Sequence, residues 1–169
     1  MFRRLIGVFG LKASVFEEIE HDQGATGQAA LIVGVVGLLS GLGGSITALR
    51  DERTLLAIIV GNIAWAFIAW LLWSVISYFV GTTFFKGKAD LGEMLRVIGY
   101  AMAPLALGII IFCGGLIGAI WALVAGFIAV RQGLDFDNTS ALLTVIIGFV
   151  IYVIGYFIFN AIGGLGLIM

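Results

Sequence analysis

The sequence predicts an all-α protein, a polytopic integral membrane protein with a five-helix transmembrane bundle and an N-terminal interfacial helix. Three observations predict this class. Of the 169 residues, 62% are hydrophobic and 11% are charged, whereas a soluble domain has about 45 to 50% and about 25%. The charges are gathered in short stretches, and long apolar runs separate these stretches. Most of the chain therefore cannot face water.

Three apolar runs are long enough to be spans. A helix needs about 20 apolar residues to cross a hydrocarbon layer about 30 Å thick. Runs of this kind cover residues 27–49, 54–81 and 141–163, and charged or turn-forming residues bound each of them. Asp137, Asn138 and Thr139 precede the last run and are better interpreted as helix N-caps than as cation ligands. These three runs predict the first, second and fifth spans.

The run from residue 94 to residue 130 predicts two further spans. As one straight helix it would be roughly 55 Å long, almost twice the thickness of the membrane core. It must therefore fold back, and Cys113-Gly114-Gly115 is the expected turn because glycine permits it sterically. The resulting spans are residues 94–111 and 115–130.

The distribution of Lys and Arg predicts an orientation, because cytoplasmic segments are enriched in them. With five spans, seven basic residues fall on one side and two on the other. The seven are Arg3, Arg4, Lys12, Lys86, Lys88, Arg96 and Arg131, and the two are Arg50 and Arg53. A four-span arrangement would give six against three. We therefore expect a cytoplasmic N-terminus and a C-terminus on the opposite side, and in a prokaryote the plasma (inner) membrane.

Residues 1–26 are expected to form a cytoplasmic amphipathic segment ahead of the membrane domain, residues 27–169. On a helix, the apolar residues of this segment fall broadly on one side and the charged residues mostly elsewhere. The apolar residues are Phe2, Leu5, Ile6, Phe9, Phe16 and Ile19. This pattern is typical of an interfacial helix on the cytoplasmic leaflet. The segment either docks lipid or a partner or only anchors the bundle, and the second interpretation is favoured.

Small residues at intervals of four predict where the helices pack closely, because membrane helices associate through small side chains. The residues expected at these contacts are Gly37 and Gly41 in the first span and Gly114, Gly118, Ala122 and Gly126 in the fourth. We expect contacts within the chain, although the same pattern allows a homo-oligomer. One face of the second span is expected to point inward, and it carries Asn62, Trp65, Ala69, Trp73 and Ser77.

The spans lack the groups that catalysis and ion coupling need. Ionisable residues inside spans mark ion pathways, and none lies deep in any span. The sequence has no HExxH motif, no paired intramembrane aspartates and no glycine-rich phosphate loop. Cys113 is the single cysteine, so an internal disulfide is excluded, and no basic stripe suggests nucleic-acid binding. We predict no catalytic residues, no metal, no cofactor and no nucleic-acid partner.

Pro104, the single proline, lies inside the third span. It cannot donate to the carbonyl of Tyr100, and its ring pushes that carbonyl aside, so the span should kink near this point. Arg96, Tyr100 and Ala103 share a face that leads from the cytoplasm to the freed carbonyl. Tyr100, Pro104 and Asn62 are thus the candidate residues of a hinge or shallow groove, and the alternative is a static bend.

Two stretches resemble a known family. The sequences "VGTTFFKGKADLGEMLRVIGYAMAPLAL" and "IWALVAGFIAVRQGLDFDNTSALLTVIIGFVIY" are similar to the Yip domain family, the Ypt- and Rab-interacting membrane proteins. The specific parts are residues 81–85, the Arg96-x-x-Gly99-Tyr100-Ala101 run that leads to Pro104, Trp121 and Ala141. The resemblance implies five spans, a cytoplasmic N-terminus and, for the eukaryotic members, contact with small GTPases and association with one another within membranes.

The short N-terminal region distinguishes this chain from the trafficking members of the family. Residues 1–26 precede the first span, and the long polar region of those members is missing from the sequence. The chain is therefore more similar to the short prokaryotic-type members, and the resemblance does not extend GTPase binding to it.

Two functions are open at this point. The first is a non-enzymatic scaffold or adaptor in which Lys86, Lys88 and Arg96 contact a partner protein or membrane lipid from the cytoplasmic side. The alternative is a small-solute permease or channel subunit that uses Asn62, Tyr100 and the Tyr100 carbonyl as a polar path. The absence of deep charge disfavours the alternative.

Overall fold

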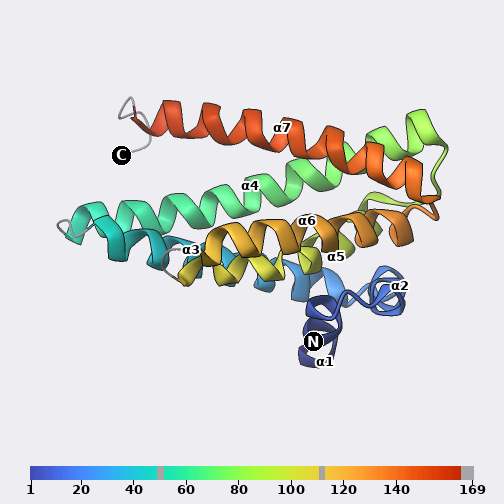
Figure 1. Ribbon diagram of the computed structural model, residues 1–169, viewed down its shortest axis with the longest axis horizontal. Helices are drawn as coiled ribbons and strands as arrows, with labels where there is room; N and C mark the ends of the chain where they lie inside the picture. The colour runs from blue at the N-terminus through green and yellow to red at the C-terminus, as the bar shows by residue number, and fades with distance from the viewer. Residues whose placement is uncertain (49–51, 111–112, 165–169) are drawn as a thin grey trace.

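The computed structural model describes residues 1–48, 52–110 and 113–164, and helices dominate this part of the chain (Figure 1). The helices are α1 (Phe2–Phe9), α2 (Ala13–His21), α3 (Ala25–Ala48), α4 (Glu52–Phe85), α5 (Leu91–Ala101), the 3₁₀ helix η1 (Ala103–Ile109), α6 (Gly114–Gly133) and α7 (Asn138–Gly164). Among the described residues, five helical segments are long and apolar enough to cross a membrane. The predicted all-α, five-span class is confirmed.

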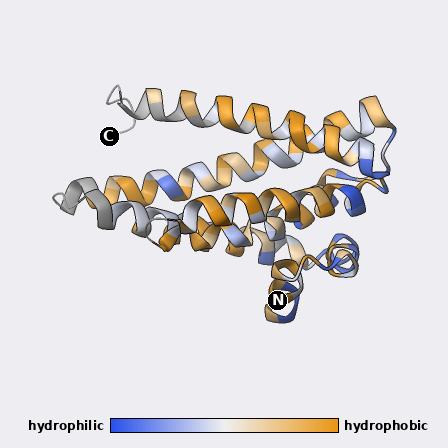
Figure 2. Ribbon diagram, in the orientation of Figure 1, coloured by the Kyte–Doolittle hydropathy of each residue, from blue (hydrophilic) through white to orange (hydrophobic). Residues whose placement is uncertain are grey.

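The long helices lie alongside one another, and the connections at one end carry most of the polar residues. In Figure 1 the α4–α5 and α6–α7 connections lie at the right end, and α1 and α2 lie beside the bundle near that end. We call this the basic end. Figure 2 shows hydrophilic residues gathered there and apolar residues along the long helices. The outer faces of these helices expose large apolar side chains such as Val60, Ile120 and Ile154, as expected where lipid surrounds the protein.

The N-terminal segment forms two short helices rather than the single helix expected. The break follows Gly10, where Leu11 adopts a left-handed conformation with φ of 53°. The Lys12 N–H donates to the Gly7 carbonyl at 3.0 Å, which closes α1 with the hydrogen bond of a Schellman motif. Helix α2 then turns its apolar residues Phe16 and Ile19 into the protein, where both are fully buried. The two helices therefore have different environments.

Glycines allow α3 and α4 to pack backbone to backbone. A Cβ added at Gly37 would lie 2.7 Å from the Ile63 Cα, and one added at Gly41 would lie 2.9 Å from the Ile59 Cα. Larger side chains would separate these helices. The small residues of the first span therefore make their contacts within the chain.

The small residues of α6 contact two other elements, η1 and α4. A Cβ at Gly118 would lie 2.6 Å from the Pro104 carbonyl oxygen, and Gly114 approaches the Leu107 carbonyl. Ala122 is buried. Farther along α6, a Cβ at Gly126 would lie 2.5 Å from the Trp73 ring. The stripe therefore seats η1 at one end and the Trp73 indole of α4 at the other.

Trp73 joins α4 to both α6 and α7. A Cβ at Gly148 of α7 would lie 2.9 Å from the Trp73 indole, opposite the contact with Gly126. Ala69 and Ser77, one turn away on either side, are also buried. This part of the expected inward face of the second span therefore lies between helices.

Pro104 marks a change of helix type. Helix α5 ends at Ala101, and the chain continues after Met102 as η1, with Pro104 in its first turn. Proline is tolerated in a first turn, because the N–H that it lacks would have no partner inside the helix. The expected bend thus takes the form of a helix break. Helix α6 begins at Gly114, within the expected turn, and residue 111 of the expected third span lies outside the described residues.

Candidate functional site

The α4–α5 connection, residues 86–90, is held at its first residue by the end of α4. Lys86 adopts a left-handed conformation with φ of 59°. The following N–H, of Gly87, donates to the Gly81 carbonyl at 3.0 Å. A left-handed residue directly after the last helical residue is a common helix ending, and this hydrogen bond closes the end of α4. The direction in which the connection leaves α4 is therefore defined.

The last residue of the connection is held by the start of α5. The Glu93 N–H donates to the Asp90 side chain at 2.7 Å, and the Asp90 N–H donates to the Glu93 side chain at 2.7 Å. This reciprocal pair is a capping box, which satisfies two N–H groups at the helix start. Both ends of the five-residue connection are thus fixed, the first by a hydrogen bond between backbone groups and the second by two hydrogen bonds from backbone N–H groups to side chains.

The middle of the connection packs on the α6–α7 connection. The Lys88 N–H donates to the Leu134 carbonyl at 3.2 Å. A Cβ at Gly87 would lie 2.7 Å from the Phe136 ring, so a larger residue at this position would have to displace that ring. The rings of Phe85 and Phe136 meet edge to face at 6.0 Å. This surface is therefore an ordered part of the basic end.

Lys86 and Lys88 are exposed, and among the described residues neither forms an ion pair or a side-chain hydrogen bond. Arg131, at the end of α6, differs from them. Its guanidinium donates to the Gln132 side chain at 3.0 Å and to the Asn138 side chain at 3.2 Å. The two lysines are therefore open to contact from outside the protein.

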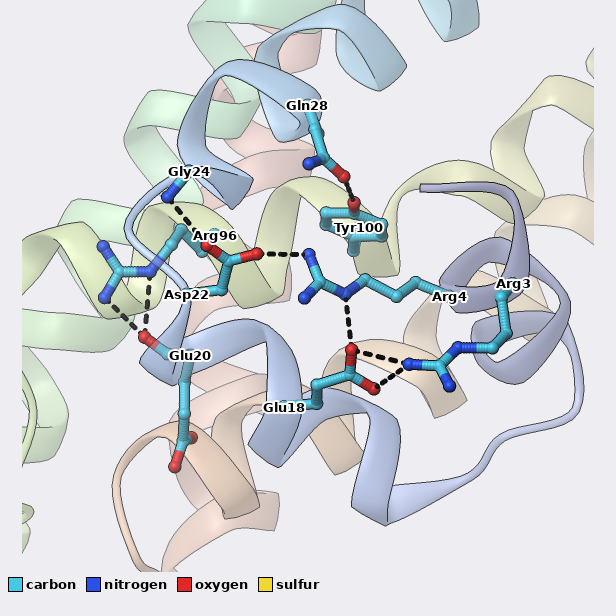
Figure 3. A network of polar contacts seen from close by, with 9 residues as sticks. All are labelled: Arg3, Arg4, Glu18, Glu20, Asp22, Gly24, Gln28, Arg96 and Tyr100. Atoms are coloured by element: carbon cyan, nitrogen blue, oxygen red, sulfur yellow. Dashed lines mark hydrogen bonds and ion pairs between the residues drawn. The ribbon is translucent and has the colours of Figure 1, made fainter.

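Arg96, the third basic residue expected at a partner surface, lies in the interior. Its exposed fraction is 6%. Its Nε donates to the Glu20 carbonyl at 2.9 Å, and its Nη2 donates to the same oxygen (Figure 3). Helix α2 therefore covers Arg96, and the structure does not place it on the same open surface as Lys86 and Lys88. Its guanidinium instead ties α5 to the end of α2.

Arg4 makes a second set of ties, from α1 to α2 and to the residues after it. Its Nε lies 3.1 Å from Glu18 and its Nη1 lies 2.6 Å from Asp22, so the guanidinium sits between two carboxylates (Figure 3). Hydrogen bonding to Arg4 lowers the pKa of Glu18 and of Asp22. Burial opposes the charge of Arg4, but the bonds to Asp22 and Glu18 outweigh it and raise the pKa of Arg4. All three groups stay charged at neutral pH.

Two further hydrogen bonds extend this set toward the spans. The second Asp22 oxygen accepts the Gly24 N–H at 2.9 Å, just before α3 begins. The Tyr100 hydroxyl donates to the Gln28 side chain, which joins α5 to the first turn of α3. We call the whole set the N-terminal clasp, and its members are Arg4, Glu18, Glu20, Asp22, Gln28, Arg96 and Tyr100.

The Glu20 carboxyl is the unbalanced group of the clasp. Its Oε1 lies 3.3 Å from His21 Nδ1. Its Oε2 is buried without a hydrogen-bond partner among the described residues. Burial is the main cause that raises the pKa of Glu20 to about 7. A carboxyl in such surroundings favours its neutral form.

The residues expected at a kink or groove do not form one open site. Tyr100 and Pro104 are fully buried. Asn62 is half-buried and its side chain donates to the Ile58 carbonyl within α4, at 2.9 Å. A Cβ at Gly41 would lie 3.3 Å from the Asn62 Cβ, so Asn62 faces α3. Asn62 and Tyr100 thus have separate local partners.

The expectations from sequence did not include the acceptors of the clasp, Glu18, Asp22 and Gln28. One signal was available. An arginine near the end of a span that is not at the surface needs an acceptor, and the acidic run of residues 17–22 is a source of acceptors close to the first span. The pairing itself joins residues 76 positions apart, and the helix pattern of one segment does not reveal it.

The comparison with known families agrees with this geometry. A family model described as the Yip1 domain matches residues 6–160, from within α1 to within α7. No curated protein and no solved structure matches the chain. The family match covers the α4–α5 connection and every member of the N-terminal clasp except Arg4. The chain therefore belongs to the Yip1 domain family of integral membrane proteins.

Proposed function

We propose that this chain is a non-enzymatic membrane scaffold or adaptor that presents the α4–α5 connection to a partner protein on the cytoplasmic side. One observation carries the proposal. Lys86 and Lys88 are exposed on an ordered connection and lack internal partners among the described residues, whereas Arg4, Arg96 and Arg131 at the same end are bound within the protein. The cytoplasmic orientation rests on the excess of basic residues at this end.

The chemistry of the connection favours a protein with an acidic surface. The lysines stand two positions apart on a backbone fixed by the end of α4, by Leu134 and by the start of α5. Because this backbone is already ordered, binding loses little backbone entropy. Charge complementarity then favours a partner that presents carboxylates. Membrane lipid is a second ligand for the same lysines, and the experiment below distinguishes the two.

Five carboxylates at the basic end have structural roles, which supports a non-enzymatic protein. Asp137 caps α7, because its side chain accepts the Thr139 N–H at 3.1 Å. Asp90 and Glu93 cap α5, and Glu18 and Asp22 hold Arg4. These carboxylates are therefore occupied in fixing the helices.

The alternative of a solute permease receives less support. A cavity of about 60 Å³ lies between α4, η1, α6 and α7. Its walls are apolar, and they are formed by Ala69, Trp73, Met102, Leu105, Ala119, Ala122, Leu123 and Phe149. A polar solute would lose its hydration there without gaining hydrogen bonds. Asn62 and Tyr100 do not line this cavity.

A photocrosslinker in place of Lys88 tests the adaptor role. In native membranes we expect a discrete protein adduct, identified by mass spectrometry, because this position faces outward from an ordered surface. The adduct should weaken when Lys86 is changed to Gln. A matched probe in place of Leu116 should give lipid adducts, because Leu116 has an exposed fraction of 69% and lies on the lipid-facing side of α6. Lipid adducts alone at position 88 would refute the adaptor role and favour flux assays in liposomes.

A further inference from the structure

Helix α1 carries an exposed apolar face that no described part of the chain covers. Phe2 and Ile6 are four residues apart, so they lie on one side of the helix, and their exposed fractions are 75% and 58%. The other side packs inward, because Val8 is fully buried and a Cβ at Gly7 would lie 2.5 Å from the Val15 side chain. The exposed apolar side is therefore not needed to hold α1 on the protein.

This exposed face continues the lipid-facing surface of the spans. The Trp121 indole donates to the Phe9 carbonyl at 3.1 Å, at the end of α1. Trp121 is partly exposed, and its neighbour on α6, Ile120, has an exposed fraction of 57%. An exposed isoleucine on a transmembrane helix faces acyl chains. Helix α1 therefore lies beside a surface that lipid covers.

The depth of α1 corresponds to the membrane interface. Arg4 bonds to Asp22, three residues before α3 begins at Ala25. Helix α1 is thus tied to the level at which the first span starts. A helix at this level has its polar residues among headgroups and its apolar residues against the acyl boundary.

The charges of α1 divide in a way that suits a negatively charged leaflet. Arg4 points inward and is only 13% exposed, between Glu18 and Asp22, whereas the Arg3 side chain is 85% exposed. Arg3 reaches Glu18 at 3.0 Å, but Arg4 also holds that carboxylate. Lys12, after the end of α1, is exposed as well. Arg3 and Lys12 are therefore available to anionic headgroups.

We propose that α1 is a lipid-binding anchor that inserts Phe2 and Ile6 into the adjacent leaflet and holds anionic headgroups with Arg3 and Lys12. Helix α2 is not part of this anchor, because Phe16 and Ile19 are fully buried against the bundle. This anchor is separate from the α4–α5 connection, and either one can fail experimentally without the other.

Spin labels in nanodiscs test the anchor. The protein would carry Cys113→Ser, to remove the exposed native thiol, together with Ile6→Cys or, as the matched control on α2, Ser14→Cys. Collisions with oxygen report lipid and collisions with a water-soluble nickel chelate report solvent. In POPC nanodiscs containing POPG, we expect the label at position 6 to favour oxygen and the label at position 14 to favour nickel. Arg3→Gln should lower the inserted population about fivefold in these nanodiscs and leave it unchanged in POPC alone.

Three results would overturn the anchor. One is a label at position 6 that is as open to nickel as the label at position 14. Another is insertion at position 6 that is equal with and without POPG, since this removes the role of anionic headgroups. The third is shielding of position 6 in native membranes but not in nanodiscs, since this indicates a protein partner on α1 in place of lipid.

Discussion

The N-terminal clasp and the α4–α5 connection lie at the same end of the bundle, and they use basic residues in opposite ways. In the clasp, Arg4 and Arg96 are bound to carboxylates and to a backbone carbonyl. In the connection, Lys86 and Lys88 face outward on a backbone that is already ordered. The number of basic residues is similar in the two regions. What distinguishes a structural cation from a binding cation is whether the fold brings an acceptor to it.

The two regions also differ in the range of the contacts that order them. The clasp joins residues distant in sequence, such as Arg96 with Glu20, which are 76 positions apart. The connection is ordered mainly by neighbours, through Gly81 with Gly87 and through Asp90 with Glu93. Changes in the clasp should therefore loosen the docking of α2, while changes to the exposed lysines should leave the fold intact.

The largest effect on the clasp is expected from Arg96→Met. Methionine fits the buried site but leaves the Glu20 carbonyl without its two donors. Losing hydrogen bonds to a charged group costs about 2 kcal/mol. The α2 amides should then exchange hydrogen roughly thirtyfold faster. Hydrogen–deuterium exchange in nanodiscs measures this, with α7 as the internal reference.

Arg96→Lys is the matched control for this prediction. Lysine keeps the charge and one donor but cannot make the two-pronged contact with one carbonyl. Its effect on α2 exchange should lie between those of wild type and Arg96→Met. Unchanged exchange in Arg96→Met would mean that α2 docks through Phe16 and Ile19 alone.

The docking of α2 is also expected to depend on pH through Glu20. A pKa raised from 4.5 to about 7 means that the folded protein holds this proton more tightly than the released segment does. The stabilisation is therefore fully present below about 4.5 and is lost as the pH rises through about 7. Exchange protection of α2, corrected for intrinsic rates, should decrease several-fold over this range.

The groups that face Glu20 explain this dependence and supply its control. Glu17 and His21 on α2, Glu93 on α5 and Asp135 after α6 act on its charge, and the three acidic residues oppose ionisation. Glu20→Gln should make α2 protection nearly independent of pH between about 5 and about 7. Glutamine mimics the protonated carboxyl and has no proton to release in this range. An equal pH dependence in Glu20→Gln would assign the titration to His21.

Glu18 and Asp22 make the clasp depend on pH in the acidic range. Their pKa values are lowered, with the hydrogen bond to Arg4 as the main cause. Their contribution is present above the ordinary pKa of a carboxyl and is lost as the pH falls through the lowered values. The clasp should therefore hold best in mildly acidic conditions.

The fold class could be predicted from the sequence because apolar length decides it. Each span is a local pattern, and the fold-back within residues 94–130 follows from membrane thickness alone. The glycine contacts were also accessible, because small residues in membrane helices mark close approach. Examples are Gly37, which packs against α4, and Gly126, which packs against the Trp73 ring.

The clasp could not be predicted in the same way, because long-range packing forms it. From the sequence, Arg96 lies at the end of a span. It is then expected to face solvent, because no pattern in the sequence shows that another segment packs over it. The cover is α2, whose position depends on the break at Leu11, and a left-handed leucine has no sequence signature. The helix change at Pro104 likewise depends on the close seat that Gly118 provides for η1.

The smallest effect on stability is expected from Lys86→Gly. This change also distinguishes the α4–α5 connection from the N-terminal clasp most clearly, because it should affect partner binding and not the fold. Lys86 has φ of 59°, a conformation that costs an ordinary residue roughly 1 to 2 kcal/mol and glycine much less. The added flexibility of glycine in the unfolded chain offsets about 0.5 to 1 kcal/mol of this gain. Thermal unfolding should therefore show a protein as stable as wild type or slightly more so, while the protein adduct at position 88 weakens because a binding charge is lost. If Lys86→Gly were destabilised as strongly as Arg96→Met, the connection would be shown to hold the fold together. The distinction between a clasp whose cations are bound within the protein and a connection whose cations are open to a partner would then be lost.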